Sequence, residues 1–157
     1  SLLPITAERS VLKLKGERSD KKLAHWQAIA VASSEQCGRN RVLQVGSPLT
    51  LTQALAARST QASLSVQSEA AGLPASGVRW VLSLAAGTQP LHEALQALTA
   101  KAGPQEITLL SGPEGGLSPA EEAEALAAGF KPVSLGSRVL RAETAPVAVL
   151  SALSLLT

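Results

Sequence analysis

The second half of the chain alternates short apolar runs with longer stretches of helical periodicity. The apolar runs cover residues 78–84, 106–110 and 132–135, and helical patterns follow the first two at residues 90–102 and 118–128. Runs that are mainly apolar, rather than apolar at every second position, are typical of strands that are covered on both faces of a parallel sheet. The pattern therefore predicts an α/β fold with a mainly parallel sheet flanked by helices.

The last helical pattern, residues 144–156, is apolar around most of its circumference. Its apolar positions include Val147, Val149, Leu150, Leu153, Leu155 and Leu156. A helix of this kind is buried on more than one side. Because its own sheet covers only one side, and an apolar patch of this size is unusual on the surface of a monomer, the pattern predicts a homodimer that buries the other side.

The first half of the chain has weaker patterns. Residues 2–5 have the pattern of a short buried strand, and residues 18–37 have that of a helix. One stripe of this helix carries Leu23, Trp26, Ala30, Ser33 and Cys37. This spacing predicts that Trp26 and Cys37 lie in the core or in an interface, whereas His25 points away from the stripe and is expected to be exposed.

The segment between residues 41 and 77 is rich in Ala, Ser, Thr and Gln. The spacing of Leu49, Leu51 and Leu55 predicts one short helix, and residues 64–66 have the pattern of a strand. We find no candidate chemistry in this segment.

Composition limits the classes of protein to which the chain can belong. Of its 157 residues, 45% are hydrophobic and 17% are charged, which is typical of one globular domain with a real core. No run approaches the roughly 18 consecutive apolar residues of a membrane span, so we expect a soluble, cytoplasmic protein. The single cysteine, Cys37, excludes an internal disulfide, and His25 and His92 are too far apart in the sequence to form a metal-binding motif.

Charge is distributed unevenly along the chain. Residues 1–41 contain eight basic and four acidic side chains, whereas the remainder contains six basic and eight acidic side chains. The basic residues of the first segment are Arg9, Lys13, Lys15, Arg18, Lys21, Lys22, Arg39 and Arg41. Such an excess attracts the phosphates of RNA without reading its sequence. An ordinary solvated surface carries the same pattern, so charge alone leaves both interpretations open.

A glycine-bearing loop follows the second apolar run. It reads Gly112-Pro113-Glu114-Gly115-Gly116 and leads into Ser118-Pro119-Ala120-Glu121, a helix start with a capping serine, a proline at the first position and a capping box. Because Glu121 and Glu122 occupy the positive end of the helix dipole, a phosphate is disfavoured there. The spacing matches neither the dinucleotide fingerprint nor a P-loop. The loop therefore predicts a pocket lined by backbone groups, for a flat ligand that is not strongly anionic.

A second glycine-bearing loop follows the third apolar run. It reads Leu135-Gly136-Ser137-Arg138-Val139-Leu140-Arg141, and Glu143-Thr144-Ala145 opens the last helix. The first run ends at Leu84, so three strand ends are expected at one edge of the sheet. Ligands of open α/β sheets bind outside the carboxyl ends of the strands, and the two glycine loops are therefore candidates for one site.

These loops resemble those of a known family, the knotted (SPOUT) RNA methyltransferases, and within it the enzymes that methylate N3 of one uridine in small-subunit (16S) ribosomal RNA. Residues 110–116 are similar to the first cofactor loop of that family, and residues 135–145 are similar to the second. Residues 6–10 (TAERS) and 35–39 (EQCGR) are similar to two further family motifs. The four motifs occur in the family's order and cover nearly the whole chain.

The resemblance implies features that periodicity does not reveal. It implies a trefoil knot in the C-terminal part, one of the known exceptions to the rule that protein chains are unknotted. It also implies a β-barrel RNA-binding domain and a first strand and helix, which we expect to precede Ser1 in a longer protein, so that residues 1–157 form the knotted catalytic domain. The implied cofactor is S-adenosyl-L-methionine, and the implied partners are ribosomal RNA of the small subunit and a second copy of the chain.

The resemblance also implies site residues. The implied cofactor-binding residues are Leu84, Leu110, Gly112, Pro113, Glu114, Gly115, Gly116, Leu135, Gly136, Arg138, Leu140, Arg141, Glu143 and Thr144. Arg9, Gln36, Arg39 and Arg141 are the candidates for catalysis or for contact with the target nucleotide. Arg9 and Arg141 would stabilise the developing uridine anion or hold a phosphate, although salt bridges within the loops are an alternative role for them.

The predicted activity is methyl transfer from S-adenosyl-L-methionine to N3 of a uridine. No histidine lies in the four motifs, so the group that accepts the N3 proton is not identified. Two other classes of function remain open on the sequence alone: a non-catalytic RNA-binding module that retains the fold, and a different α/β enzyme that uses a nucleotide cofactor. Binding of S-adenosylhomocysteine rather than ATP would distinguish the three.

Overall fold

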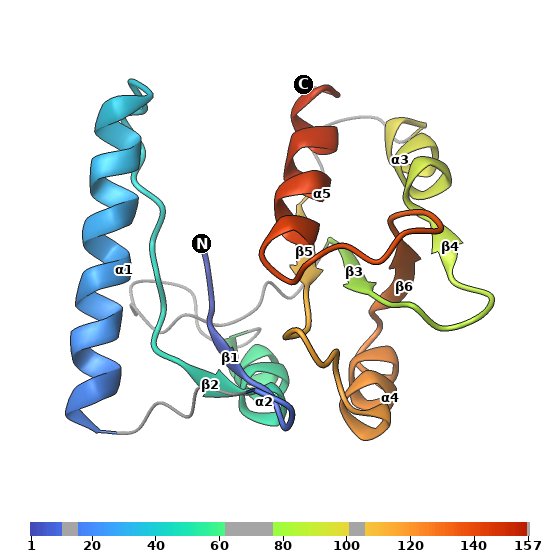
Figure 1. Ribbon diagram of the computed structural model, residues 1–157, viewed down its shortest axis with the longest axis horizontal. Helices are drawn as coiled ribbons and strands as arrows, with labels where there is room; N and C mark the ends of the chain where they lie inside the picture. Colours follow the sequence, from blue (N-terminus) through green and yellow to red (C-terminus); the bar gives the residue numbers. More distant parts are fainter. Residues whose placement is uncertain (11–15, 62–76, 101–105, 157) are drawn as a thin grey trace. The chain divides into compact units, whose positions relative to one another are not determined.

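The structure is a computed structural model of the chain, and it divides into two compact units (Figure 1). The residues that it describes are 1–10, 16–61, 77–100 and 106–156. The first unit comprises Ser1–Thr6 and Ser10–Leu73, and the second comprises Ala7–Arg9 and Pro74–Thr157. A short N-terminal segment thus belongs to the second unit, together with the C-terminal half of the chain.

The second unit is built around a four-stranded sheet in the order β4-β6-β3-β5. Its strands are β3 (Val78–Leu82), β4 (Gln89–Pro90), β5 (Ile107–Leu110) and β6 (Lys131–Ser134). Every pairing is parallel: β3 pairs with β5 and with β6, and β4 pairs with β6. The predicted α/β fold with a parallel sheet is confirmed, and the carboxyl ends of these strands meet at one edge.

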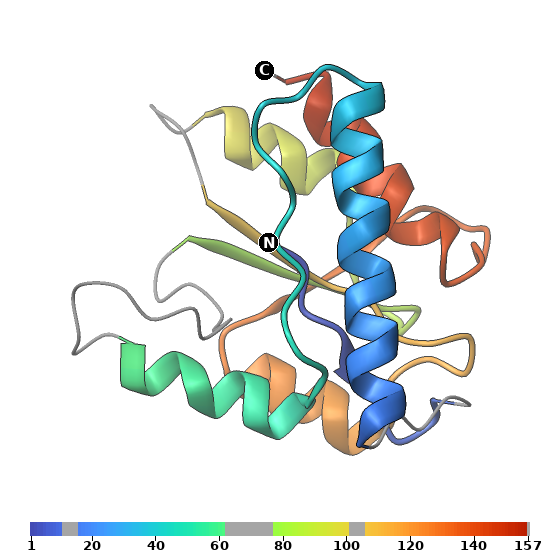
Figure 2. The ribbon, with the colours of Figure 1, turned by 90° about the vertical axis from the view of Figure 1, so that its left-hand side faces the viewer.

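Helices cover both faces of this sheet. They are α3 (Leu91–Thr99), α4 (Pro119–Ala127) and α5 (Thr144–Ser154). Figures 1 and 2 both show α3 and α5 on one face and α4 on the opposite face. This arrangement explains why apolar residues of the strands occur on both faces of the sheet: each face packs against helices.

The central strand β3 serves the two faces alternately, because successive side chains of a strand point to opposite sides. Trp80 packs with Val133 of β6 and Val149 of α5 in the core beneath α3 and α5, and only 2% of Trp80 is exposed. The neighbouring Val81 is fully buried on the other face. On that face Arg79 also donates to the carbonyl oxygen of Ala128, just past α4, at 3.5 Å.

The predicted limits of α4 are confirmed. Ser118 is the N-cap residue, and the capping box with Glu121 is present. At the other end Gly129 has a φ of +86°, a left-handed conformation that glycine adopts without strain. The backbone N–H of Phe130 then donates to the carbonyl oxygen of Ala125 at 3.1 Å, and Phe130 is buried. Local sequence chemistry therefore fixes both ends of this helix.

The first unit contains a two-stranded parallel sheet and two helices. The elements are β1 (Ile5–Thr6), α1 (Glu17–Gln36), β2 (Leu49–Thr50) and α2 (Leu51–Gln61), and Figure 2 shows α1 as one continuous helix. The side chain of Gln27 on α1 donates to the carbonyl oxygen of Leu43 at 3.0 Å and accepts from the backbone N–H of Val45 at 2.9 Å. These bonds hold the returning chain along the helix.

Two expectations for the first unit need correction. The strand expected at residues 2–5 begins only at Ile5, as β1, and is half-buried rather than buried; Leu2 is 48% exposed and makes an isolated bridge to Val45. Cys37 is exposed, so its place in a core is also wrong; Ala30 and Ser34 are the buried residues of α1. Along the stripe, Ala30 is buried and Leu23 and Trp26 are half-buried, whereas Ser33 and Cys37 are exposed, so the helical period alone does not predict burial at the end of this helix.

The other expectations were confirmed, were shifted by a residue or lie outside the described residues. The exposure of His25 and the short helix, now α2, are confirmed. The helix expected at residues 90–102 begins at Leu91, because Gln89–Pro90 pairs with β6 as a short strand. The strand expected at residues 64–66 lies outside the described residues. Within the described ranges, no helix combines the length and apolarity that a membrane crossing requires.

The start of β3 generates a stability prediction. Gly77 has a φ of +106°, and the next residue, Val78, donates its N–H to the carbonyl oxygen of Glu106 at 2.8 Å. A Cβ at Gly77 would overlap that same oxygen. We expect Gly77→Ala to lower the free energy of unfolding by about 2 to 4 kcal/mol, from backbone strain plus overpacking, as measured by urea denaturation.

Gly87→Ala is the matched control. Gly87 has a φ of +79°, but no atom lies within 4 Å of a Cβ placed there. This variant therefore carries the backbone strain alone, about 1 kcal/mol or somewhat more. Equal losses for the two variants would contradict a close approach between the Gly77 and Glu106 backbones.

Candidate functional site

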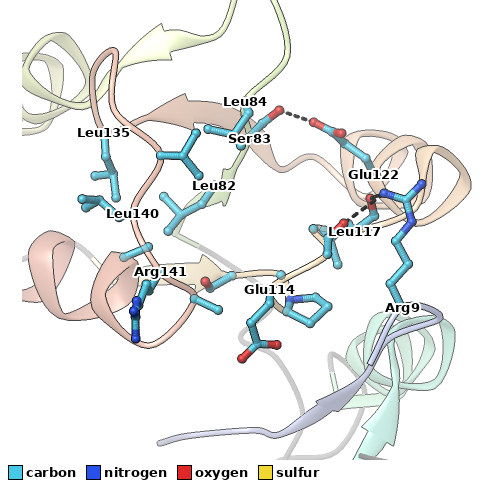
Figure 3. Close-up of a pocket in the computed structure, with 18 of the residues that line it drawn as sticks. Arg9, Leu82, Ser83, Leu84, Glu114, Leu117, Glu122, Leu135, Leu140 and Arg141 are labelled. Atoms are coloured by element: carbon cyan, nitrogen blue, oxygen red, sulfur yellow. Dashed lines mark hydrogen bonds between the residues drawn. The ribbon is translucent and has the colours of Figure 1, made fainter. Parts of the chain in front are cut away.

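Three loops at the carboxyl edge of the sheet enclose a cleft in the second unit (Figure 3). The loops follow β3, β5 and β6, and the cleft has a volume of about 840 Å³. Arg9 also lines it, from the N-terminal segment that belongs to this unit. Parallel pairing thus brings together segments that are far apart in the sequence.

The loop after β5 makes a tight turn that depends on glycine. The N–H of Gly116 donates to the carbonyl oxygen of Pro113 at 2.8 Å, and Gly116 has a φ of +69°. A Cβ on Gly112 would lie 2.9 Å from the backbone nitrogen of Leu117, which is too close for any other residue. Without these side chains, the backbone itself forms much of this wall of the cleft.

The capping box fixes the direction in which α4 leaves this loop. The Ser118 hydroxyl accepts from the N–H of Glu121 at 3.3 Å, and Oε2 of Glu121 accepts from the N–H of Ser118 at 2.8 Å. Ser118 is buried. Because side chains of the helix already bind these N–H groups, they are not offered to a phosphate.

The N-terminal segment around Arg9 is fastened to the same loop. The N–H of Glu8 donates to the other carboxylate oxygen of Glu121, Oε1, at 2.8 Å. The guanidinium of Arg9 donates to the carbonyl oxygens of Gly115 at 3.0 Å and Leu117 at 3.5 Å. A Cβ on Gly115 would lie 3.3 Å from Cβ of Arg9, so the arginine packs directly on this glycine.

The loop after β6 forms the opposite wall. Gly136 has a φ of +101°, which lets the chain turn away from the strand. The carbonyl oxygen of Arg141 accepts from the N–H groups of Thr144 at 2.9 Å and Ala145 at 3.0 Å, where α5 begins. The Arg141 and Glu143 side chains approach to 4.0 Å and are 86% and 66% exposed, so this pair contributes little to stability.

A buried serine connects the end of β3 to the first turn of α4. The Ser83 hydroxyl donates to Oε1 of Glu122 and accepts from the N–H of Ala85 at 3.1 Å. Both Ser83 and Glu122 line the cleft, and Figure 3 shows the bond between them. This contact connects the loop after β3 to α4, the helix that follows the loop after β5.

The lining combines apolar side chains with both signs of charge. Its leucines are Leu82, Leu84, Leu117, Leu135 and Leu140, its cations are Arg9, Arg138 and Arg141, and its carboxylates are Glu114, Glu122 and Glu143. Apolar walls suit a flat ring, and balanced charge suits a zwitterion better than a polyanion. No group of three metal-ligating side chains occurs among the residues that the structure describes.

The cleft gathers most of the residues expected to bind a cofactor. Those that line it are Leu84, Gly112, Pro113, Glu114, Gly115, Gly116, Leu135, Arg138, Leu140, Arg141 and Glu143. Three others are adjacent to the cleft in sequence and do not line it. Leu110 is a buried residue of β5, Gly136 turns the chain after β6, and Thr144 is the first residue of α5.

Other lining residues were missed. They are Leu82, Ser83, Ala85, Ser111, Leu117, Pro119, Glu122, Val133, Val139, Ala142 and Ala145. Most are sequence neighbours of the expected residues, but Ser83 and Glu122 form a polar contact that no motif indicated. The sequence did contain a signal for this contact. A polar residue at the end of an apolar run and a carboxylate in the first turn of a following helix are both expected at the carboxyl edge of the sheet.

The four candidates for nucleotide contact separate into two groups. Arg9 and Arg141 line the cleft of the second unit. Gln36 and Arg39 belong to the first unit: Gln36 is the last residue of α1, and the N–H of Arg39 donates to the carbonyl oxygen of Ser34 at 2.9 Å. The side chains of Gln36 and Arg39 are exposed.

Sequence comparison gives a family for nearly the whole chain. A family model described as an RNA methyltransferase domain matches residues 1–154. The ribosomal RNA small subunit methyltransferase E of Synechocystis sp. is 35% identical over 154 residues, which are 98% of this chain and 44% of that protein. The protein of the same name from Bacillus subtilis is 32% identical over 157 residues, with 98% and 55% covered. The chain spans about half the length of these curated relatives.

Comparison of structures gives the same result. The crystal structure of ribosomal RNA small subunit methyltransferase E from Neisseria gonorrhoeae, bound to S-adenosyl methionine, matches with a TM-score of 0.76 and 32% identity. The match covers 98% of this chain and 55% of that one. Because the family model covers almost every residue and the fold agrees, the chain belongs to the family of RNA methyltransferase domains.

Proposed function

We propose that this chain binds S-adenosyl-L-methionine and transfers its methyl group to N3 of a uridine in small-subunit (16S) ribosomal RNA. The observation that carries the proposal is the cleft at the carboxyl edge of the sheet, where two glycine loops meet and Arg9 contacts the first of them. Relatives named for methylation of small-subunit ribosomal RNA support the substrate. A module that only binds RNA would not need these glycine loops, so the non-catalytic alternative is not favoured.

The cleft fits the proposed cofactor in size and chemistry. Its volume of about 840 Å³ lies within the range of small-molecule sites. The leucines can hold the faces of an adenine ring, and the mixture of Arg and Glu side chains matches a ligand that carries an ammonium, a sulfonium and a carboxylate. When bound, the cofactor would supply a methyl group already activated by its sulfonium.

The protein's main contribution is then orientation. Holding two reactants in line lowers a barrier by up to roughly 7 to 11 kcal/mol in well-oriented cases. Arg9 and Arg141, on the cleft wall, are proposed to stabilise the anion of the target uridine or to hold its phosphate. Gln36 and Arg39, exposed on the first unit, are proposed to contact the target nucleotide.

The first unit offers a basic surface for RNA. Exposed basic residues of its described part are Arg18, Lys21, Lys22, Arg39 and Arg41. We propose that they attract ribosomal RNA through its phosphates, which raises affinity without selecting a sequence. The proposal further includes a trefoil knot in the C-terminal part, which would bend the two glycine loops around the cofactor, and a cytoplasmic site of action.

Helix α5 supports a homodimer as the active form. Val149 is fully buried and Leu153 packs against the core of the second unit. On the same helix Val147 is 58% exposed and Leu150 is 60% exposed. We propose that a second copy covers these side chains, in a two-fold interface of at least about 1,000 Å².

Calorimetric titration tests the proposed cofactor. We expect the chain to bind S-adenosylhomocysteine and not ATP, and Gly115→Val to abolish this binding because its side chain would displace Arg9, which lines the cleft. Gly136→Val should act similarly, through strain at a φ of +101°. Gly87→Val, outside the cleft lining, is the control with a strained backbone. Undiminished affinity in a folded Gly115→Val protein would remove the first loop from the site.

Methylation of 16S ribosomal RNA tests the role of Arg9. We expect Arg9→Ala to lower kcat/KM about a hundredfold, the usual effect of losing a charged group that stabilises a transition state. Lys21→Ala, which removes an exposed charge from α1, should weaken RNA binding modestly and reduce its salt dependence. If the two variants behave alike, Arg9 is a general phosphate contact.

Sedimentation equilibrium tests the homodimer. We expect twice the mass of one chain at micromolar concentration, and Leu150→Asp should give the monomer and lose methylation, because a charge would be buried in the interface. Leu126→Asp is the matched control, since Leu126 is an exposed leucine of α4 with 42% of its surface accessible. A wild-type monomer would refute the interface.

A further inference from the structure

Glu122 differs from the two other carboxylates that line the cleft. Glu114 and Glu143 are exposed, and Glu143 lies 4.0 Å from the guanidinium of Arg141. Glu122 is half-buried in the first turn of α4, and its carboxylate accepts from the hydroxyl of Ser83. Among the described residues Glu122 makes no ion pair, so its charge is held by a neutral donor.

Ser83 fixes the orientation of this carboxylate. Only 8% of Ser83 is exposed, and its one hydroxyl proton is donated to Oε1 of Glu122 while its oxygen accepts from Ala85. A carboxylate has about four acceptor positions on two oxygens, and Ser83 occupies one of them. The remaining positions, including those on Oε2, are left for a donor in the cleft, since half-buried charged groups are normally hydrogen-bonded.

The geometry of β3 places this acceptor beside the apolar part of the cleft. Leu82 and Ser83 are successive residues, so their side chains leave opposite faces of the sheet. Leu82 and Leu135 are packed against the core cluster beneath α3 and α5, and Figure 3 shows Leu135 and Leu140 on the opposite side of the cleft from Glu122. A planar base held by these leucines would carry its sugar toward Glu122.

Resting on the proposed cofactor, we infer that Glu122, positioned by Ser83, accepts hydrogen bonds from the ribose hydroxyls of S-adenosyl-L-methionine. A carboxylate suits this role because its oxygens match the two donors of a vicinal diol, as acidic residues do for the ribose of dinucleotides in other α/β folds. It also repels phosphate groups, which agrees with a cofactor that has none. Glu122 is therefore a binding residue that selects a ribonucleoside.

Calorimetry tests the inference. The two main ligands are S-adenosylhomocysteine and its 2′-deoxyribose analogue, S-inosylhomocysteine tests recognition of the base, and the proteins are the wild-type chain, Glu122→Gln and Ser83→Ala. We expect loss of the 2′-hydroxyl to weaken binding to the wild type at least about tenfold, the usual effect of losing a hydrogen bond to a charged group. Glu122→Gln should weaken binding of S-adenosylhomocysteine by a similar factor and distinguish poorly between the two ligands. Ser83→Ala should show a smaller loss of the same kind.

Glu93→Gln is the control for the change of charge. Glu93 lies in the first turn of α3, is exposed and does not line the cleft. This variant removes the same charge from the first turn of another helix, and its affinities should equal those of the wild type. Thermal unfolding of each variant verifies the fold, and the Ser83→Ala result decides the case if Glu122→Gln does not fold.

The outcomes separate this inference from the proposed function. If the wild type binds S-adenosylhomocysteine and Glu122→Gln retains that affinity, the inference is overturned and the proposed function stands. If the variant loses discrimination against S-inosylhomocysteine, which lacks the 6-amino group, rather than against the deoxy analogue, Glu122 reads the base and the ribose assignment is wrong. If the wild type does not bind S-adenosylhomocysteine, the proposed function fails and the inference fails with it.

Discussion

The second unit depends on the parallel pairing of β3 with both of its neighbours. Register places Val81 opposite Leu110 of β5 and Pro132 of β6, so the three strands end near the same level. Parallel strands require long connections, and the connections that lead to β5 and β6 contribute α3 and α4 to the two faces of the sheet. As a result, three loops emerge at one edge with their directions set by packed helices. The core and the cleft thus have a common cause.

Glu121 connects this edge to the distant N-terminal segment. One carboxylate oxygen closes the capping box of α4 and the other accepts from the backbone of Glu8, 113 residues away in the sequence. The next residue, Arg9, is thereby held where its guanidinium contacts the glycine loop. The side chain of Glu121 therefore takes part both in a local helix cap and in a long-range contact. The position of Arg9, the proposed substrate-binding arginine, depends on where α4 begins.

Local chemistry made the sheet, the capping box and the glycine loops predictable. An apolar run, a serine three residues before a glutamate and a glycine after a strand each report on their own few residues. The two-residue strands β2 and β4 were missed because their hydrogen bonds come from neighbours and not from periodicity. The contact between Ser83 and Glu122 was missed for the same reason, since 39 residues separate them. Whether Cys37 is exposed likewise depends on which other segments pack against the helix, and the helical period of the sequence carries no information about those segments.

Helix α5 relates the cleft to the proposed interface between two copies. Its first turn is set by the carbonyl oxygen of Arg141, which lines the cleft, and its middle packs on the core through Val149. Because a helix is rigid over this length, a partner that packs against the exposed Leu150 would also restrain the backbone of the second glycine loop. On this view the apolar side chains on the outer face of α5 serve the site as well as the association.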